Sequence, residues 1–271
     1  MISEWSVSGL RPWLLGLLLC CGSTQAQNVH IVHCLGGCPT GTADSNELVV
    51  RHLFAVSVNR QTRIADWVAY RVLRDTVGVA SLLPREWHED ELSRFGLTAD
   101  AVGKSPQAIS QPSLDNQQDQ AYRLTEIQVN PADQGRLVPM SSFAATDYWA
   151  HLNRLTVLSP LRSDMRLGPL ARLDQAINAL ARSAGELGVF SGPVGGNAAD
   201  SDGQPEAFFR IVALPDGRAA AFLLLQGLPR HADYCAQLTS IAEVERLTGL
   251  DFFPRQAHWP TGDLHPALGC P

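Results

Sequence analysis

The fold is indicated most directly by residues 206–226, which read EAFFRIVAL-PDG-RAAAFLLLQ. Two apolar runs flank the tripeptide Pro-Asp-Gly, which contains the residue types that tight turns require. The stretch therefore predicts two strands, 206–214 and 218–226, that pair as an antiparallel hairpin.

A second hairpin is predicted nearer the N-terminus. Residues 47–58 and 63–74 alternate apolar with polar side chains, and the polar segment 59–62 separates them. Alternation of this kind is typical of strands that bury one face. The two hairpins together indicate an antiparallel sheet.

Helices are predicted between and after these strands. Residues 169–187 carry leucine and isoleucine at helical spacing, with Gly188 as the expected stop. A capping box begins at Ser240 and opens a short helix that ends at Gly249. Strand pairs with a few helices predict the α+β class, an antiparallel sheet with helices packed on it, as one domain over residues 27–271.

The composition sets limits on the function. The chain has 271 residues, 45% of them hydrophobic, and a net charge of −6, which argues against a general electrostatic affinity for nucleic acid. Lys104 is the only lysine, so nearly all positive charge is arginine. Residues 133–182 are locally positive, with six arginines against four aspartates. A local anion-binding groove is therefore compatible with the acidic chain.

Residues 1–26 have the pattern of an export signal. Arg11 precedes the apolar run 13–21, which is too short to span a bilayer, and small residues follow it. We expect cleavage after Ala26, which places the protein in the periplasm or outside the cell. No later stretch is apolar and long enough to be a membrane anchor, so no membrane association is expected.

Export also accounts for the cysteines. Cys34, Cys38, Cys235 and Cys270 remain after residue 26, and four cysteines in an oxidising compartment favour two disulfides. Two glycines between Cys34 and Cys38 suit a tight loop, and the other pair would tie down the C-terminal tail. A zinc site is the alternative use of these four sulfurs.

Further motifs are collinear with those of one family. They are the cysteine loop 34–41, Val50-Arg51-His52, residues 65–70, Gly168-x-x-x-Arg172-Leu173, Ser191-Gly192-Pro193 and residues 243–250. The chain resembles the secreted DNA/RNA non-specific endonucleases, which have the ββα-metal nuclease fold. The resemblance covers nearly the whole chain after residue 26. It implies that fold, and it implies the pairing of Cys34 with Cys38 and of Cys235 with Cys270.

The resemblance also implies a catalytic motif, and that motif is altered here. Members of the family hydrolyse phosphodiester bonds with magnesium, a water-activating base and phosphate-binding arginines. Their Asp-Arg-Gly-His motif corresponds to Asp133, Gln134, Gly135 and Arg136. Arg136 stands in place of the histidine base, and a guanidinium offers no lone pair to accept a proton. Gln134 replaces the phosphate-contacting arginine without its charge.

The metal-binding half of the family pattern is altered too. The resemblance places the magnesium-ligating asparagine at Arg166 and the acidic residue that holds the metal's waters at Asp174. A hard divalent cation needs oxygen ligands, which guanidinium does not supply. Arg85, which matches an arginine near the scissile phosphate, and Asn153 are retained.

These substitutions predict a site that binds phosphate without cleaving it. The base and the metal ligand have both become arginine, and two polar neighbours have become Val157 and Leu161. We therefore expect binding of nucleic acid or another polyanion through Arg85, Arg136, Asn153 and Arg166, with catalysis lost and magnesium not bound.

Two alternatives remain open. One is an active metal-dependent endonuclease with relocated groups, in which His151 is the base and Asp133, Asp147 or Asp164 recruits the metal. The other is a protein-binding decoy or partner of an active enzyme. Nucleic acid, DNA or RNA, is the expected partner, and a homodimer is compatible with the sequence.

Overall fold

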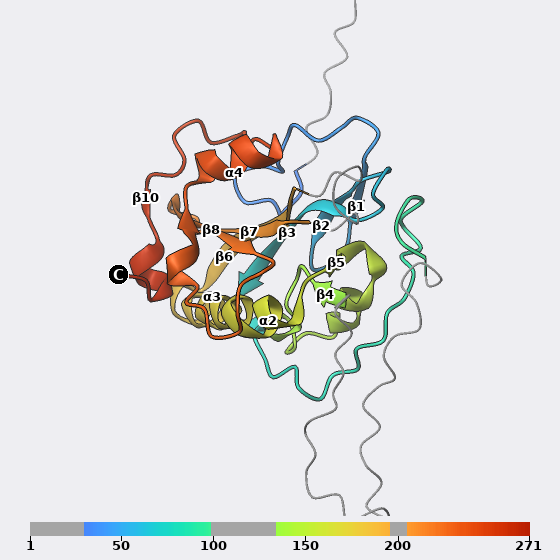
Figure 1. Ribbon diagram of the computed structural model, residues 1–271, viewed down its shortest axis with the longest axis horizontal. Coiled ribbons are helices and arrows are strands. Elements are labelled where there is room, and N and C mark those ends of the chain that lie inside the picture. The colour runs from blue at the N-terminus through green and yellow to red at the C-terminus, as the bar shows by residue number, and fades with distance from the viewer. Residues whose placement is uncertain (1–29, 99–133, 196–204) are drawn as a thin grey trace, which may run out of the picture. The chain divides into compact units, whose positions relative to one another are not determined.

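The computed structural model describes residues 30–98, 134–195 and 205–271, and the fold below is that of Ile31–Pro271. The predicted signal and Asp133 lie outside the described residues. An eight-stranded sheet follows the order β1-β2-β3-β6-β7-β8-β10, with β9 paired to β8, and a separate ribbon joins β4 to β5 (Figure 1). The strands are β1 Glu47–Val50, β2 Ala55–Val58, β3 Ala65–Leu73, β4 Gln134–Arg136, β5 Leu158–Pro160, β6 Glu186–Val194, β7 Ala207–Ala213, β8 Arg218–Leu225, β9 Leu238–Thr239 and β10 Gly262–Asp263.

Both predicted hairpins are present. Strands β2 and β3 pair antiparallel with Val56 opposite Val68, and β7 and β8 pair antiparallel with Phe209 opposite Leu223. β6 lies between β3 and β7, so it joins the two hairpins into one sheet. The predicted α+β class with an antiparallel sheet is confirmed.

The prediction of one strand over 47–58 is wrong. The segment is broken into β1 and β2 by a tight turn, which the backbone N–H of Arg51 closes by donating to the carbonyl of Phe54 at 2.8 Å. The guanidinium of Arg51 is buried in an ion pair with Asp90. The turn thus begins at a residue that forms a buried ion pair with a distant partner, which the local alternation of the sequence does not reveal.

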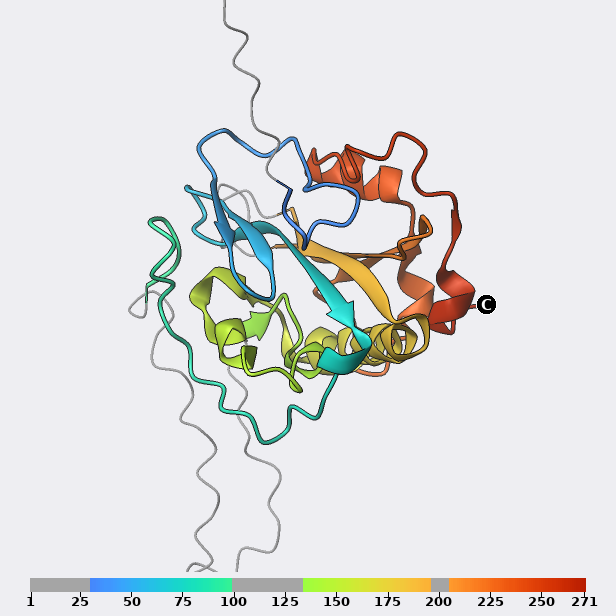
Figure 2. The same ribbon diagram turned by 180° about the vertical axis from the view of Figure 1, so that it is seen from behind.

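The sheet is covered on both faces. Helix α3, Ala171–Ala184, packs Leu173 and Ile177 on one face, and helix α4, Ile241–Thr248, packs Val244 on the other (Figures 1 and 2). Successive residues of a strand point to opposite faces, which is why the central strand β7 is buried along its whole length. Among the described residues, no helix has the length and apolar character needed to cross a membrane.

The predicted helix over 169–187 ends earlier than expected. α3 stops at Ala184, and Gly185 follows it with a φ of 95° that favours glycine. Gly188, the predicted stop, lies inside β6, where an added Cβ would sit 2.7 Å from the Cβ of Leu35. The second helix begins and ends as predicted, since Ser240 accepts a hydrogen bond from the N–H of Glu243 and Gly249 follows the last turn.

Gly168 lies in the kinked segment Arg166–Leu170 between α2, Ser163–Met165, and α3. A Cβ there would lie 2.3 Å from the carbonyl oxygen of Arg230, which is backbone and cannot rotate away. We expect Gly168→Ala to lower the free energy of unfolding by roughly 1–3 kcal/mol, measured by urea denaturation. Gly227→Ala is the control, because nothing lies within 4 Å of its added Cβ. Equal stability of the two variants would contradict this close approach.

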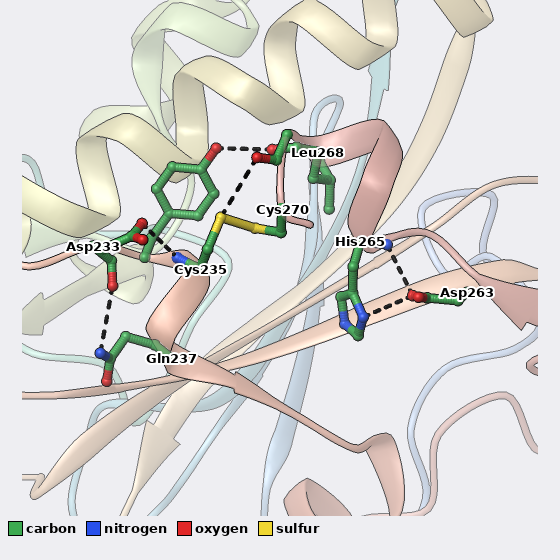
Figure 3. Close-up of a disulfide and its surroundings, with 9 residues drawn as sticks. Asp233, Cys235, Gln237, Asp263, His265, Leu268 and Cys270 are labelled. Carbon is green, nitrogen blue, oxygen red and sulfur yellow. Dashed lines mark hydrogen bonds and ion pairs between the residues drawn. A yellow bond between two sulfur atoms is a disulfide. The ribbon is translucent and has the colours of Figure 1, made fainter.

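Both predicted disulfides are present. Cys34 is bonded to Cys38 and Cys235 to Cys270, so these sulfurs are not available as zinc ligands. Figure 3 shows the second bridge, which joins the C-terminal segment to the 3-10 helix η8, Cys235–Gln237. Beside it, the hydroxyl of Tyr234 donates to the carbonyl of Leu268 at 2.8 Å. The C-terminal segment is therefore attached to residues 234 and 235 by a disulfide and a hydrogen bond.

Candidate functional site

The motif residues lie on the ribbon β4–β5, beside the main sheet. Gly135 stands opposite Ser159, and Arg136 stands opposite Leu158. A Cβ on Gly135 would lie 2.3 Å from the Cδ1 of Leu161, a buried side chain, so close packing explains the glycine of the motif. Val157 and Leu161 are fully buried and belong to the hydrophobic core. They contribute packing and no polar group to the site.

Arg136 is held in a defined position. Its Nε donates to the carbonyl of Leu152 at 3.1 Å, and its Nη2 donates to Oδ1 of Asn153 at 2.6 Å. Its guanidinium also lies over the ring of Trp87, 4.1 Å from the centroid. The amide nitrogen of Asn153 donates to the carbonyl of Pro84 at 3.1 Å. Asn153 is only 3% exposed, so its placement favours orienting Arg136 over direct contact with a substrate.

The positive charges of Arg85 and Arg166 act on the guanidinium of Arg136, and we call these three residues the arginine cluster. Burial, together with the positive charges of Arg85 and Arg166, lowers the pKa of Arg136 to about 10. At neutral pH Arg136 is still protonated, so it cannot activate water as a base. An anion placed among these charges would relieve their repulsion, and the exposed Arg85 could contact it directly. Gln134 lies two residues from Arg136 on the same strand.

Asp174 is engaged elsewhere. Its Oδ1 lies 3.1 Å from Nη2 of Arg210, a residue of β7 that is 1% exposed. Nη1 of Arg210 donates to the hydroxyl of Tyr70 and, at 3.1 Å, to the carbonyl of Leu137. Burial raises the pKa of Asp174 to about 6, and the nearby Arg210 opposes this. The carboxylate of Asp174 therefore balances the buried charge of Arg210, a residue that is not part of the family motif.

A cavity of about 330 Å³ opens beside Asp174. Ser141, Asn178 and Arg182 are among its polar lining residues. The amide of Asn178 is used internally, because it accepts from Ser142 at 2.6 Å and donates to Ser141 at 3.0 Å. The cavity thus holds one carboxyl group that already has a cationic partner.

These side chains do not fit a divalent cation. The resemblance assigns two positions to the cation and its bound water: Arg166 is a guanidinium, and Asp174 is paired with Arg210. Within the described ranges, no group of three or more His, Cys, Asp or Glu side chains has a metal-binding arrangement. Hard cations need several oxygen ligands, so the donor set lacks what magnesium requires.

His151, the alternative base, lies on the 3-10 helix η5, Trp149–Asn153. Burial lowers its pKa, and the charges of Arg51, His52 and Arg154 lower it further, so its imidazole is neutral at neutral pH. Its ring meets those of His52 and Tyr148, two residues that the motif comparison did not select as functional. A usable signal for His52 was its place in the family-like segment Val50-Arg51-His52.

The fold and the altered motif together define a protein of the ββα-metal nuclease type. A chain in the crystal structure of the EndoG/EndoGI complex superposes with a TM-score of 0.58, covering 77% of this chain and 86% of that one. At 14% identity this likeness concerns the fold alone. The chain belongs to the DNA/RNA non-specific endonuclease family, whose profile matches residues 37–258. A nuclease from Serratia marcescens is 29% identical over 252 residues, which are 87% of this chain and 86% of that protein.

Proposed function

We propose that this family member binds nucleic acid, or a similar polyanion, at the arginine cluster without cleaving it. The supporting observation is the buried Arg136, held by Leu152 and Asn153 while the charges of Arg85 and Arg166 act on it. Clustered guanidiniums bind phosphate oxygens through charge-assisted hydrogen bonds.

Loss of catalysis is part of this proposal. The guanidinium of Arg136 keeps its proton, so the family's base is missing from its position. Magnesium has no suitable donor set, because Arg166 stands at the ligand position and Asp174 is paired with Arg210. The site would therefore bind a phosphate in its ground state and would not stabilise the transition state of hydrolysis.

Export is also proposed. Residues 1–26 have the pattern of a cleavable signal, and the two disulfides fit an oxidising compartment, the periplasm or the cell exterior. N-terminal sequencing of the protein from culture medium and periplasm would locate it and test cleavage after Ala26. A homodimer stays a prediction, which sedimentation analysis would test.

Replacing the exposed Arg85 with alanine should weaken nucleic-acid binding without disturbing the fold. We expect lower affinity for DNA and RNA together, and a slope of log affinity against log salt reduced by about 1, because one phosphate contact is removed. Arg136→Ala should weaken binding more. Fluorescence anisotropy across a salt series measures both. Arg246→Ala is the matched control, because Arg246 lies on α4 and forms a surface pair with Glu243.

The same preparations test for cleavage. Plasmid DNA and RNA incubated with magnesium or manganese should remain intact. Cleavage that His151→Ala abolishes would instead support the second candidate, an active endonuclease with a relocated base, which the neutral imidazole of His151 favours. Equal binding by wild type, the Arg85 variant and the Arg136 variant would overturn the proposed site.

A further inference from the structure

A group of aromatic rings, which we call the ring cluster, lies on the surface. The imidazole of His52 stacks on the ring of Tyr148, with centroids 4.3 Å apart and planes inclined by 6°. His151 meets both rings edge-on, at 5.0 and 5.9 Å. His52 is exposed and Tyr148 is 48% exposed. Mutual stacking covers one face of each ring, so aromatic surface remains open to solvent.

The ring cluster is held in place by ion pairs. His52 lies in the turn between β1 and β2, next to Arg51, and His151 lies in η5, followed by Arg154. Glu91 bridges the two elements, at 3.0 Å from Arg51 and 2.8 Å from Arg154. Arg51 is paired with the buried Asp90 as well. The rings are therefore preorganised, and the neighbouring arginines already have carboxylate partners.

The ring cluster adjoins the arginine cluster through η5. His151 precedes Leu152 and Asn153, the two residues whose oxygens accept hydrogen bonds from Arg136. Tyr148 is the N-cap residue of η5 and His151 lies within it, so the segment that carries these two rings also supplies the oxygens that hold Arg136. One short 3-10 helix thus anchors residues of both clusters.

We infer that the His52–Tyr148 pair is a stacking subsite for an unpaired nucleobase whose strand is held at the arginine cluster. This rests on the proposed function and specifies its ligand as single-stranded nucleic acid. Bases stack on aromatic side chains whatever their sequence, and only single strands, loops and ends present free base faces. The nearby arginines are paired with Asp90 and Glu91, so this surface suits a base better than a second phosphate.

The test uses the full chain, Tyr148→Ala and Tyr148→Phe, with three labelled probes. These are a short single-stranded oligonucleotide, the same backbone without bases, and the duplex, all compared by anisotropy at one salt concentration. We expect Tyr148→Ala to weaken binding of the base-bearing single strand roughly tenfold. Binding of the abasic strand and the duplex should stay unchanged, and Tyr148→Phe should retain wild-type binding. Leu82→Ala controls for loss of an exposed side chain, since Leu82 is 89% exposed.

A second readout is the fluorescence of 2-aminopurine in the single strand. Stacking on Tyr148 should quench it in the wild type and in Tyr148→Phe but not in Tyr148→Ala. Equal losses on base-bearing and abasic strands, or wild-type affinity of Tyr148→Ala for all probes, would overturn the stacking subsite alone. If the wild type binds none of the probes at low salt, the proposed function fails and the subsite falls with it.

Discussion

Asp174→Ala should lower the free energy of unfolding by about 3–5 kcal/mol, the largest effect expected from a single substitution in this chain. Among the described residues, this carboxylate is the acidic group that forms an ion pair with Arg210, whose side chain is 1% exposed. Arginine cannot release its proton in a protein, so the variant would keep a buried cation facing only the neutral oxygens of Tyr70 and Leu137. Urea denaturation, with the m-value monitored, measures the loss.

Removing the cation should be less damaging than removing the anion. In Arg210→Met, Asp174 can take up a proton, because burial raises its pKa and the opposing charge of Arg210 is gone. The double variant Asp174→Asn, Arg210→Met contains neither buried charge, so it should be more stable than Asp174→Ala. Asp216→Ala is the control, since the exposed carboxylate of Asp216 interacts with the guanidinium and the backbone N–H of its near neighbour Arg218. A loss in Asp174→Ala no larger than in Asp216→Ala would show that the buried pair is not needed.

The double variant Cys235→Ser, Cys270→Ser should lower the free energy of unfolding by roughly 3–4 kcal/mol. The bond closes a loop with a sequence separation of 35, and in the chain-entropy model its loss restores that freedom to the unfolded chain. The released segment includes Leu264 and Leu268, which are buried in the core cluster that α3 covers. Partial exposure of these side chains should add to the loss.

Cys34→Ser, Cys38→Ser is the matched control for the disulfide. Its loop has a separation of 4, for which the same model gives about 2 kcal/mol. Urea unfolding of both variants, and of the wild type with and without reductant, would compare the two bonds. A larger loss from the short loop than from the long one would contradict the entropic account.

Much of the fold could be predicted because its signals are local. The Pro-Asp-Gly turn at 215–217 lies between β7 and β8, and Ser240 caps α4 as its spacing to Glu243 indicates. The predictions were wrong where distant partners decide. The strand predicted over 47–58 is interrupted at Arg51, whose side chain pairs with the distant Asp90. α3 stops at Ala184, and β6, which pairs with the distant strands β3 and β7, already begins at Glu186.

For the site, the sequence predicted the chemistry of single residues but not the residues that they contact. That Arg136 cannot be a base follows from its guanidinium alone. Its contacts with Trp87 and Asn153 were not evident, because they come from segments that only the fold brings to β4. Arg210 was overlooked for the same reason. Arg210 lies between Phe208 and Val212 on the strand face toward α3. An arginine at such an inward-facing position was the available signal for a buried ion pair.

The sequence by itself determined the two hairpin turns, the cap of α4, the family resemblance and the replacement of the motif histidine by Arg136. Each depends on residue identity or on neighbours within a few positions. Only the tertiary structure decided that Asp174 balances Arg210 and that His52 stacks on Tyr148. The hydrogen bond between Arg210 and Tyr70 spans 140 residues. Such pairs form because the sheet and α3 bring distant side chains into a dry interior, where an unpaired charge is too unfavourable to remain.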